Sequence, residues 1–120
     1  MPCIWMGLGM RKAEERKALN EATFRDANEK LNRAARELLR DDDGSPVPFL
    51  CECPSRSCTE VVLLTLAEYE RVRSGAARGL EVPGHEDLSV ERVVARHGRF
   101  VVTEKFGRAG EVFAATSPRE

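Results

Sequence analysis

An uninterrupted run of helix-forming residues fills residues 11–40. The run contains no proline and no glycine, and it is rich in alanine, glutamate, lysine, arginine and leucine, a composition that strongly favours α-helix. At 1.5 Å per residue, such a helix is roughly 45 Å long. The sequence therefore predicts a long amphipathic helix over residues 11–40, and it leaves residues 41–120 for the rest of the fold.

Apolar residues recur within this run with heptad spacing. Phe24, Leu31 and Leu38 are seven positions apart, and Ala27 and Ala34 lie between them. The pattern is compatible with an amphipathic helix that packs on its own domain. It is also compatible with a coiled coil, parallel or antiparallel, formed with a partner protein or with a second copy of the chain. The sequence leaves both interpretations open.

The first ten residues are apolar, but they lack a positively charged start and are broken by two glycines. They are too short and too interrupted for a signal peptide, so we expect residues 1–10 to be disordered or to precede a true start at Met10. No stretch approaches the length of apolar sequence that a membrane span needs. The sequence therefore predicts a cytoplasmic protein, in which thiols stay reduced.

Three cysteines lie close together in the second part of the chain. Val47–Cys53 and Cys58–Leu64 are predicted to be two strands of a hairpin, and this pairing sets Cys53 opposite Cys58. Cys51 lies on the same face as Cys53, because strand side chains alternate with a period of two. Three sulfur ligands on one face of a hairpin are typical of a zinc or redox site.

A closed zinc site needs a fourth ligand, and the candidates are three side chains or a water molecule. His85 lies in a Pro-Gly loop and has no other evident role, so it is the predicted ligand. Glu60, which the hairpin register sets opposite Cys51, and His97 are the alternatives. The predicted cofactor is thus zinc, and the predicted site consists of Cys51, Cys53, Cys58 and His85.

The remaining elements are predicted from caps and periodicity. Three aspartates at residues 41–43, followed by Gly44, indicate a solvated connection that ends the long helix. Three helices are expected after it: Leu66–Arg73, which begins with a capping box, Val90–His97 and, on weaker evidence, Ala109–Ala115. The further strands are expected at Gly79–Val82 and Phe100–Phe106. The predicted class is α+β, with the long N-terminal helix followed by a small antiparallel sheet (the hairpin and one or two further strands) and two short helices. Residues 41–120 form the module that carries the metal or thiol site.

Charge and motifs exclude several functions. The net charge is −1, with 19 basic and 20 acidic residues, so nucleic acid and acidic membranes are unlikely partners. The chain has no H-E-x-x-H zincin motif, deaminase motif, phosphate-binding loop or nucleophile elbow, and no small-molecule substrate is evident.

Three functional hypotheses remain. The first is a non-enzymatic zinc-binding regulatory or interaction protein, whose helix over residues 11–40 contacts a partner protein or a second copy. The second is a redox sensor that forms a transient disulfide between Cys53 and Cys58, with Arg56 lowering a thiol pKa. The third is a zinc-dependent hydrolase in which Glu52 or Glu60 acts as the general base.

Several short motifs resemble those of one protein family. They are N-E-A-T-F-R-D-A-N-E at Asn20–Glu29, F-L-C-E-C, C-T-E and L-T-L-A-E-Y within Phe49–Tyr69, P-G-H-E at Pro83–Glu86, and E-R-V-V-A-R-H at Glu91–His97. Together they resemble a family of small actinobacterial proteins that has no established activity. The resemblance spans roughly residues 20–105 and implies that the helix and the thiol cluster belong to one module.

Overall fold

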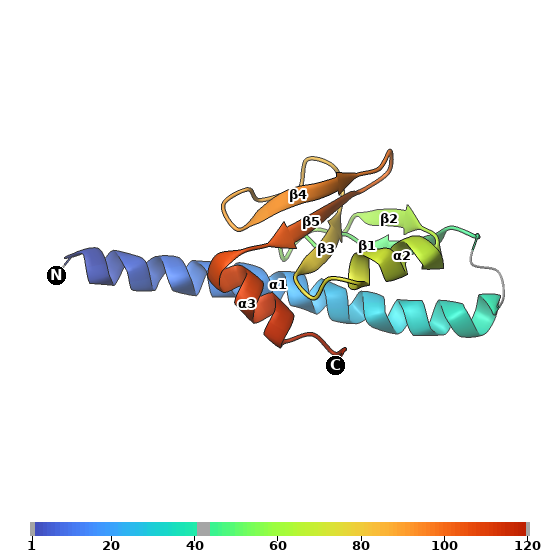
Figure 1. Ribbon diagram of the computed structural model, residues 1–120, viewed down its shortest axis with the longest axis horizontal. Coiled ribbons are helices and arrows are strands. Elements are labelled where there is room, and N and C mark those ends of the chain that lie inside the picture. The colour runs from blue at the N-terminus through green and yellow to red at the C-terminus, as the bar shows by residue number, and fades with distance from the viewer. Residues whose placement is uncertain (1, 41–43, 120) are drawn as a thin grey trace.

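The computed structural model describes residues 2–40 and 44–119, with side chains from Lys12 onward within these ranges (Figure 1). The predicted acidic connection at residues 41–43 lies outside the described residues. The elements are α1 (Pro2–Leu39), β1 (Val47–Leu50), β2 (Val61–Leu64), α2 (Leu66–Arg73), β3 (Arg78–Glu81), β4 (Glu91–Arg96), β5 (Val101–Lys105) and α3 (Gly107–Ala115).

The predicted α+β class is confirmed, and the strands form two small antiparallel sheets. β1 pairs with β2, and a second sheet has the order β3-β5-β4. Both sheets lie on one side of α1, and both ends of α1 extend beyond them (Figure 1). The molecule is correspondingly elongated, with principal extents of 59 × 29 × 24 Å.

The long helix begins earlier than the sequence indicated. α1 starts at Pro2, within the residues 1–10 that we expected to be disordered or to precede a true start at Met10, and it ends at Leu39. Proline is well tolerated in the first turn of a helix, and each of the two glycines costs a helix only about 1 kcal/mol relative to alanine. The apolar residues between them are otherwise compatible with helix, so the run continues through them.

α1 packs on the rest of the fold through a polar face. The buried positions recur at intervals of three and four residues, as a single helix face requires. They are Ala18, Glu21, Ala22, Arg25, Asn28, Glu29 and Asn32. The prediction of a helix packed on its own domain is thus confirmed, but the face in contact is different from the apolar heptad face, on which Leu31 is 39% and Leu38 84% exposed.

Arg25 joins α1 to the C-terminal helix. Its guanidinium donates hydrogen bonds to the backbone oxygens of Phe113 at 2.5 Å and Thr116 at 2.7 Å. The same group lies 4.3 Å from the centroid of the Phe113 ring, a cation–π contact. Arg25 therefore adds polar contacts to an interface in which Ala18 and Ala22 of α1 also pack against Ala109 and Phe113 of α3.

The expected helix over Val90–His97 is wrong, because these residues form strand β4. Burial alternates along it: Glu91, Val93 and Ala95 face inward, whereas the residues between them are exposed. β4 pairs with β5, with a register irregularity between Val93 and Ala95. The β-branched valines favour a strand. Pairing with β5 therefore outweighed the i, i+3, i+4 spacing from which the helix was predicted.

The other elements are close to their predicted positions. In α2, the Thr65 hydroxyl accepts a hydrogen bond from the Glu68 amide at 3.1 Å, and the Glu68 carboxylate accepts one from the Thr65 amide at 2.8 Å, which confirms the capping box. Tyr69 of this helix stacks on Phe49 of β1, with the ring centroids 4.4 Å apart. This contact belongs to the main core, which α2 shares with both sheets.

Candidate metal centre

The β1–β2 hairpin has the predicted register. Leu50 pairs with Val61, and the next amide, that of Cys51, donates to the Glu60 carbonyl at 3.0 Å. The same register, continued toward the turn, sets Cys53 opposite Cys58. The ladder itself ends at Leu50, however, so the cysteines lie in the irregular segment that joins the two strands.

Four side chains converge beside this segment. The sulfur atoms of Cys51, Cys53 and Cys58 and one ring nitrogen of His85 all lie within 4.8 Å of one another. Nδ1 of His85 is 3.7 Å from Sγ of Cys51 and 3.7 Å from Sγ of Cys58. Zinc–sulfur bonds of about 2.3 Å and zinc–nitrogen bonds of about 2.0–2.1 Å give a tetrahedral S···N edge of about 3.6 Å. The arrangement can therefore hold a metal ion with four protein ligands.

His85 is oriented from its other ring nitrogen. Nε2 lies 2.7 Å from Oε2 of Glu60, and the His85 amide donates to the Val82 carbonyl at 3.0 Å. The adjacent Gly84 has φ = 96°, a conformation that favours glycine and shapes the loop that presents His85. When Nε2–H donates a hydrogen bond to Glu60, Nδ1 carries the lone pair, and this lone pair faces the thiols.

The thiols themselves are largely shielded from water. Cys51 is 1% and Cys53 2% exposed, whereas Cys58 and His85 are partly exposed. Burial raises the pKa of Cys53 to about 11 and raises the pKa of Cys51 as well. The Val82 amide donates to Sγ of Cys51 at 3.3 Å, the kind of contact that stabilises a thiolate. A bound cation would displace the thiol protons and supply the missing positive charge.

The alternative ligands occupy other positions. Glu60 contacts His85 from outside the group of four rather than joining it. His97 follows β4, is exposed and stacks on Phe100 with ring centroids 4.4 Å apart. Among the described residues, His97 is not part of a group with metal-binding spacing.

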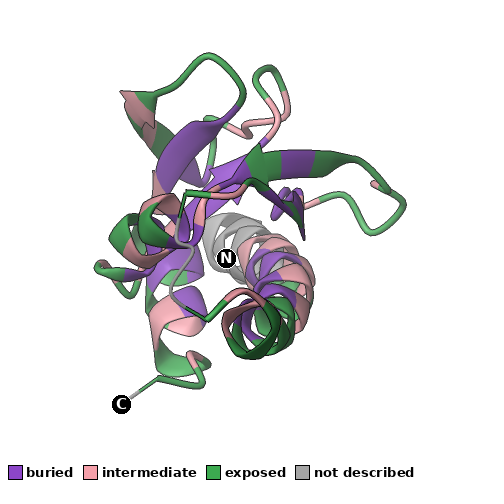
Figure 2. Cartoon of the chain, turned by 90° about the vertical axis from the view of Figure 1, so that its right-hand side faces the viewer, coloured by how far each residue is buried: buried purple, intermediate pink, exposed green. Residues whose placement is uncertain are grey.

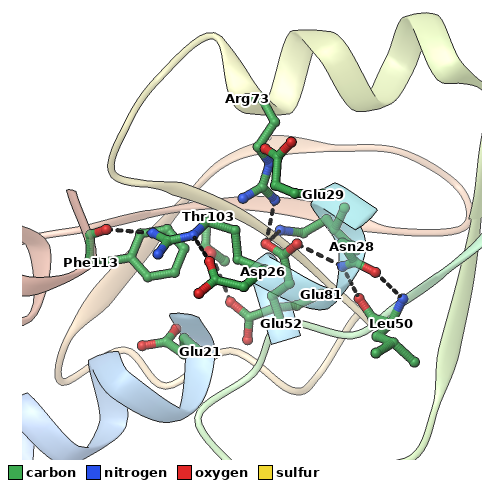
Figure 3. A network of polar contacts seen from close by, with 12 residues as sticks. Glu21, Asp26, Asn28, Glu29, Leu50, Glu52, Arg73, Glu81, Thr103 and Phe113 are labelled. Atoms are coloured by element: carbon green, nitrogen blue, oxygen red, sulfur yellow. Dashed lines mark hydrogen bonds and ion pairs between the residues drawn. The ribbon is translucent and has the colours of Figure 1, made fainter. Parts of the chain in front are cut away.

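Glu52, a proposed general base, points away from the thiols. The carboxylate forms an ion pair with Arg73 and accepts hydrogen bonds from Nδ2 of Asn28 at 2.7 Å and from the Leu80 amide at 3.2 Å (Figure 3). The side chain is fully buried. Its position on the opposite face follows from the alternation of side chains along an extended chain. Glu52, in the segment after β1, therefore contacts α1, α2 and β3 instead of facing the site.

A second group of acidic side chains lies between α1 and the three-stranded sheet. Glu21, Glu81 and Glu91 are buried, and an oxygen of each lies within 4.8 Å of the others. Nζ of Lys105 is among them, at 2.7 Å from Glu21, 3.2 Å from Glu81 and 2.8 Å from Glu91. The hydroxyl of Thr103 donates to Glu81 at 2.7 Å. The lysine ammonium occupies the place that a cation would take, so we interpret this group as a buried ionic cluster.

Sequence reasoning missed this ionic cluster. Charged residues on a long helix usually face solvent, and nothing in the sequence distinguishes Glu21 from its exposed neighbours. The one available signal was Glu91, which occupies an inward position once Glu91–Arg96 is assigned as a strand with alternating burial.

Comparisons of the chain with protein-family models, curated proteins and solved structures gave no match. The resemblance to a family of small actinobacterial proteins therefore stays a prediction. Among the described residues, no helix combines the length and the apolar character that spanning a membrane requires.

Proposed function

We propose that this chain is a small, non-enzymatic zinc-binding protein in which zinc is held by Cys51, Cys53, Cys58 and His85. The observation that carries the proposal is the orientation of His85, whose Nδ1 lies 3.7 Å from two thiols while Nε2 contacts Glu60. A histidine turned toward thiols by a carboxylate on its other nitrogen is the arrangement usually found at zinc ligands.

The chemistry of the donor atoms favours zinc over other cations. Three thiolates and one imidazole are soft or borderline ligands, which suit zinc and are poor ligands for magnesium or calcium. Four ligand atoms within 4.8 Å of one another match the preference of zinc for four ligands.

The same donor atoms favour a structural role over a hydrolytic one. Four protein ligands leave no coordination position for water, whereas catalytic zinc sites keep one position open. Neither proposed base is available, since Glu52 is paired with Arg73 and Glu60 with His85. A structural zinc therefore explains the arrangement of these side chains better than a hydrolytic one.

Zinc at this site would join the two sheets. Three of the ligands lie in the segment between β1 and β2, and His85 lies in the loop after β3. A backbone hydrogen bond from the Glu52 amide to the Leu80 carbonyl, at 2.8 Å, connects the same regions. Structural zinc sites contribute on the order of 10 kcal/mol to folding, enough to fix this junction.

The segment between β1 and β2 that carries the three cysteines, here called the thiol segment, also contacts α1. Nδ2 of Asn20 donates a hydrogen bond to the Pro54 carbonyl at 3.0 Å. A regulatory or interaction role would then use α1 as the partner surface.

The redox alternative is supported by the register of the hairpin, which sets Cys53 opposite Cys58. It is weakened by burial, which raises the pKa of Cys53 to about 11 and so disfavours the reactive thiolate. One measurement, the mass of the protein after mild peroxide treatment, distinguishes the two functions. A redox sensor forms a disulfide and loses the mass of two hydrogens, whereas thiols bound to zinc are protected from this oxidation.

Metal content tests the proposal directly. Protein purified under reducing conditions without added metal is expected to contain one zinc per chain by elemental analysis. Replacement by Co²⁺ should give the intense visible absorption of a tetrahedral cobalt–thiolate site. His85→Ala is expected to lose tight zinc binding, and His97→Ala serves as the matched control, because these are the two histidines of the chain. Wild-type protein that neither contains nor binds zinc, or an equal loss in both variants, would contradict the proposal.

A further inference from the structure

The C-terminal part of the apolar heptad face of α1 is left exposed by the fold of a single chain, whereas Phe24 and Ala27 are partly buried. We define the α1 seam as Phe24, Ala27, Leu31, Ala34 and Leu38, all of which lie in the described part of the helix. Leu31 is 39% and Leu38 84% exposed, and Ala34 is exposed. In a view along the helix, the buried residues of α1 face the sheets, and exposed residues dominate its free C-terminal end (Figure 2).

We propose that the α1 seam binds the α1 seam of a second copy of this chain, with the two helices antiparallel. This interaction is independent of the zinc site and goes beyond it. The proposal rests on three features of the seam. They are the alternation of large and small side chains, the charges that flank it, and the thiol segment that covers its N-terminal end.

Side-chain size determines the layers of the interface. Leucine and alanine alternate along the seam, so an antiparallel partner can place each leucine against an alanine. Leu31 then lies opposite the partner's Ala34, and Leu38 lies opposite the partner's Ala27. A parallel pair would instead set leucine against leucine and alanine against alanine, which leaves gaps at the alanine layers.

Charge selects the same antiparallel register. Lys30 and Glu37 flank the seam on one side, both are exposed, and neither forms an ion pair or a hydrogen bond with another described side chain. In the register set by the leucine–alanine layers, Lys30 lies beside the partner's Glu37. Two-fold symmetry repeats this pair, so the interface gains two complementary contacts. A parallel pair would set Lys30 beside the partner's Ala35, with no charge to meet it.

The thiol segment sets the limit of the interface. Asn20 of α1 is hydrogen-bonded to the Pro54 carbonyl, so this segment lies over the helix at the N-terminal end of the seam. The partner's α1 ends at its Leu39, just beyond the layer in which the partner's Leu38 meets Ala27. The proposed register therefore uses the free part of the seam and stops before the covered part.

Sedimentation velocity over a concentration series tests the dimer. Wild-type protein is expected to show a concentration-dependent monomer–dimer equilibrium, because two heptads make a small interface. Leu31→Glu and Leu38→Glu are expected to be monomeric throughout, with unchanged zinc content and circular dichroism, since both side chains are exposed in the single chain. A wild-type chain that stays monomeric up to roughly 1 mM overturns the proposal.

Charge reversal tests the antiparallel register. Lys30→Glu and Glu37→Lys are each expected to weaken the dimer roughly ten-fold, because each replaces two attractions by two repulsions. The double variant, which exchanges the charges, is expected to restore the wild-type affinity. Arg33→Glu is the control: it makes the same charge change as Lys30→Glu on an exposed residue outside the seam. A double variant that is not restored, or a control that weakens the dimer equally, overturns the register.

Discussion

Glu60 and His85 form a carboxylate–histidine pair at the edge of the thiol group. Oε2 of Glu60 lies 2.7 Å from Nε2 of His85, while Nδ1 of the same ring faces the sulfur atoms. Glu60 was an alternative ligand in the sequence, and its position instead suggests a role in orienting one. The distinction has a measurable consequence, because removing a ligand should lower zinc affinity more than removing a group that orients a ligand.

Glu60→Ala is expected to lower zinc affinity by about 10–100-fold without abolishing binding, the usual effect of removing a carboxylate that orients a metal-binding histidine. Competition with a chromophoric chelator measures the change. Thr59→Ala, an exposed neighbour, should leave the affinity unaltered. An unchanged affinity in Glu60→Ala would show that His85 needs no help from this carboxylate.

Removal of the metal should loosen one region more than the others. After chelation under reducing conditions, the segment between β1 and β2 and the loop after β3 are expected to lose protection from hydrogen exchange, because the proposed zinc would join them. The contact between α1 and α3, which includes the hydrogen bonds of Arg25, should change much less. Equal loss of protection everywhere would indicate that the metal supports the whole fold rather than this junction.

The buried pair of Glu52 and Arg73 is expected to matter for stability and not for zinc. Arg73→Met leaves the Glu52 carboxylate buried without its cation, which should cost about 3–5 kcal/mol of unfolding free energy. Urea unfolding of the zinc-loaded proteins measures this cost. Arg71→Met, on the exposed side of the same helix, should stay within about 0.5 kcal/mol of wild type. Zinc stoichiometry should be one in both variants, and loss of zinc from Arg73→Met would link the pair to the site.

The ionic cluster around Lys105 should make stability depend on pH. Burial raises the pKa of Glu21 to about 9 and that of Glu81 to about 10, from 4.5. Although burial opposes it, hydrogen bonds from Glu81 and Glu21, together with Lys105, lower the pKa of Glu91. These directions favour the protonated form of Glu21 and Glu81 and the ionised form of Glu91 beside Lys105.

The sign of the pH effect follows from these directions. Because the folded-state pKa of Glu21 and Glu81 exceeds the unfolded value, their stabilising contribution is complete below about pH 4.5 and is lost as the pH rises toward 9–10. The free energy of unfolding should therefore decrease with a measurable slope as the pH rises through that window. Glu21→Gln and Glu81→Gln should each reduce this slope in urea unfolding at several pH values. Glu111→Gln, on an exposed residue, should not, and equal slopes in all variants would contradict the assignment.

Local sequence signals predicted the elements that depend on local chemistry. The capping box at Thr65 and Glu68 fixed the start of α2, and the spacing of the cysteines gave the hairpin register that sets Cys51 opposite Glu60. Glu91–Arg96 was assigned wrongly, because its short apolar spacing fits a helix as well as a strand. Pairing with the neighbouring strand β5, which the apolar spacing within Glu91–Arg96 does not encode, decided between them.

The sequence by itself determined the α+β class, the long helix and the three thiols on one face, since each follows from residue type and spacing over a few turns or one hairpin. Tertiary structure alone decided which face of α1 is buried and how Glu60 contacts His85. It also decided that Glu21, Glu81 and Glu91 surround Lys105. These outcomes depend on contacts between distant segments, in which a buried charge is tolerated only where a partner from another element meets it.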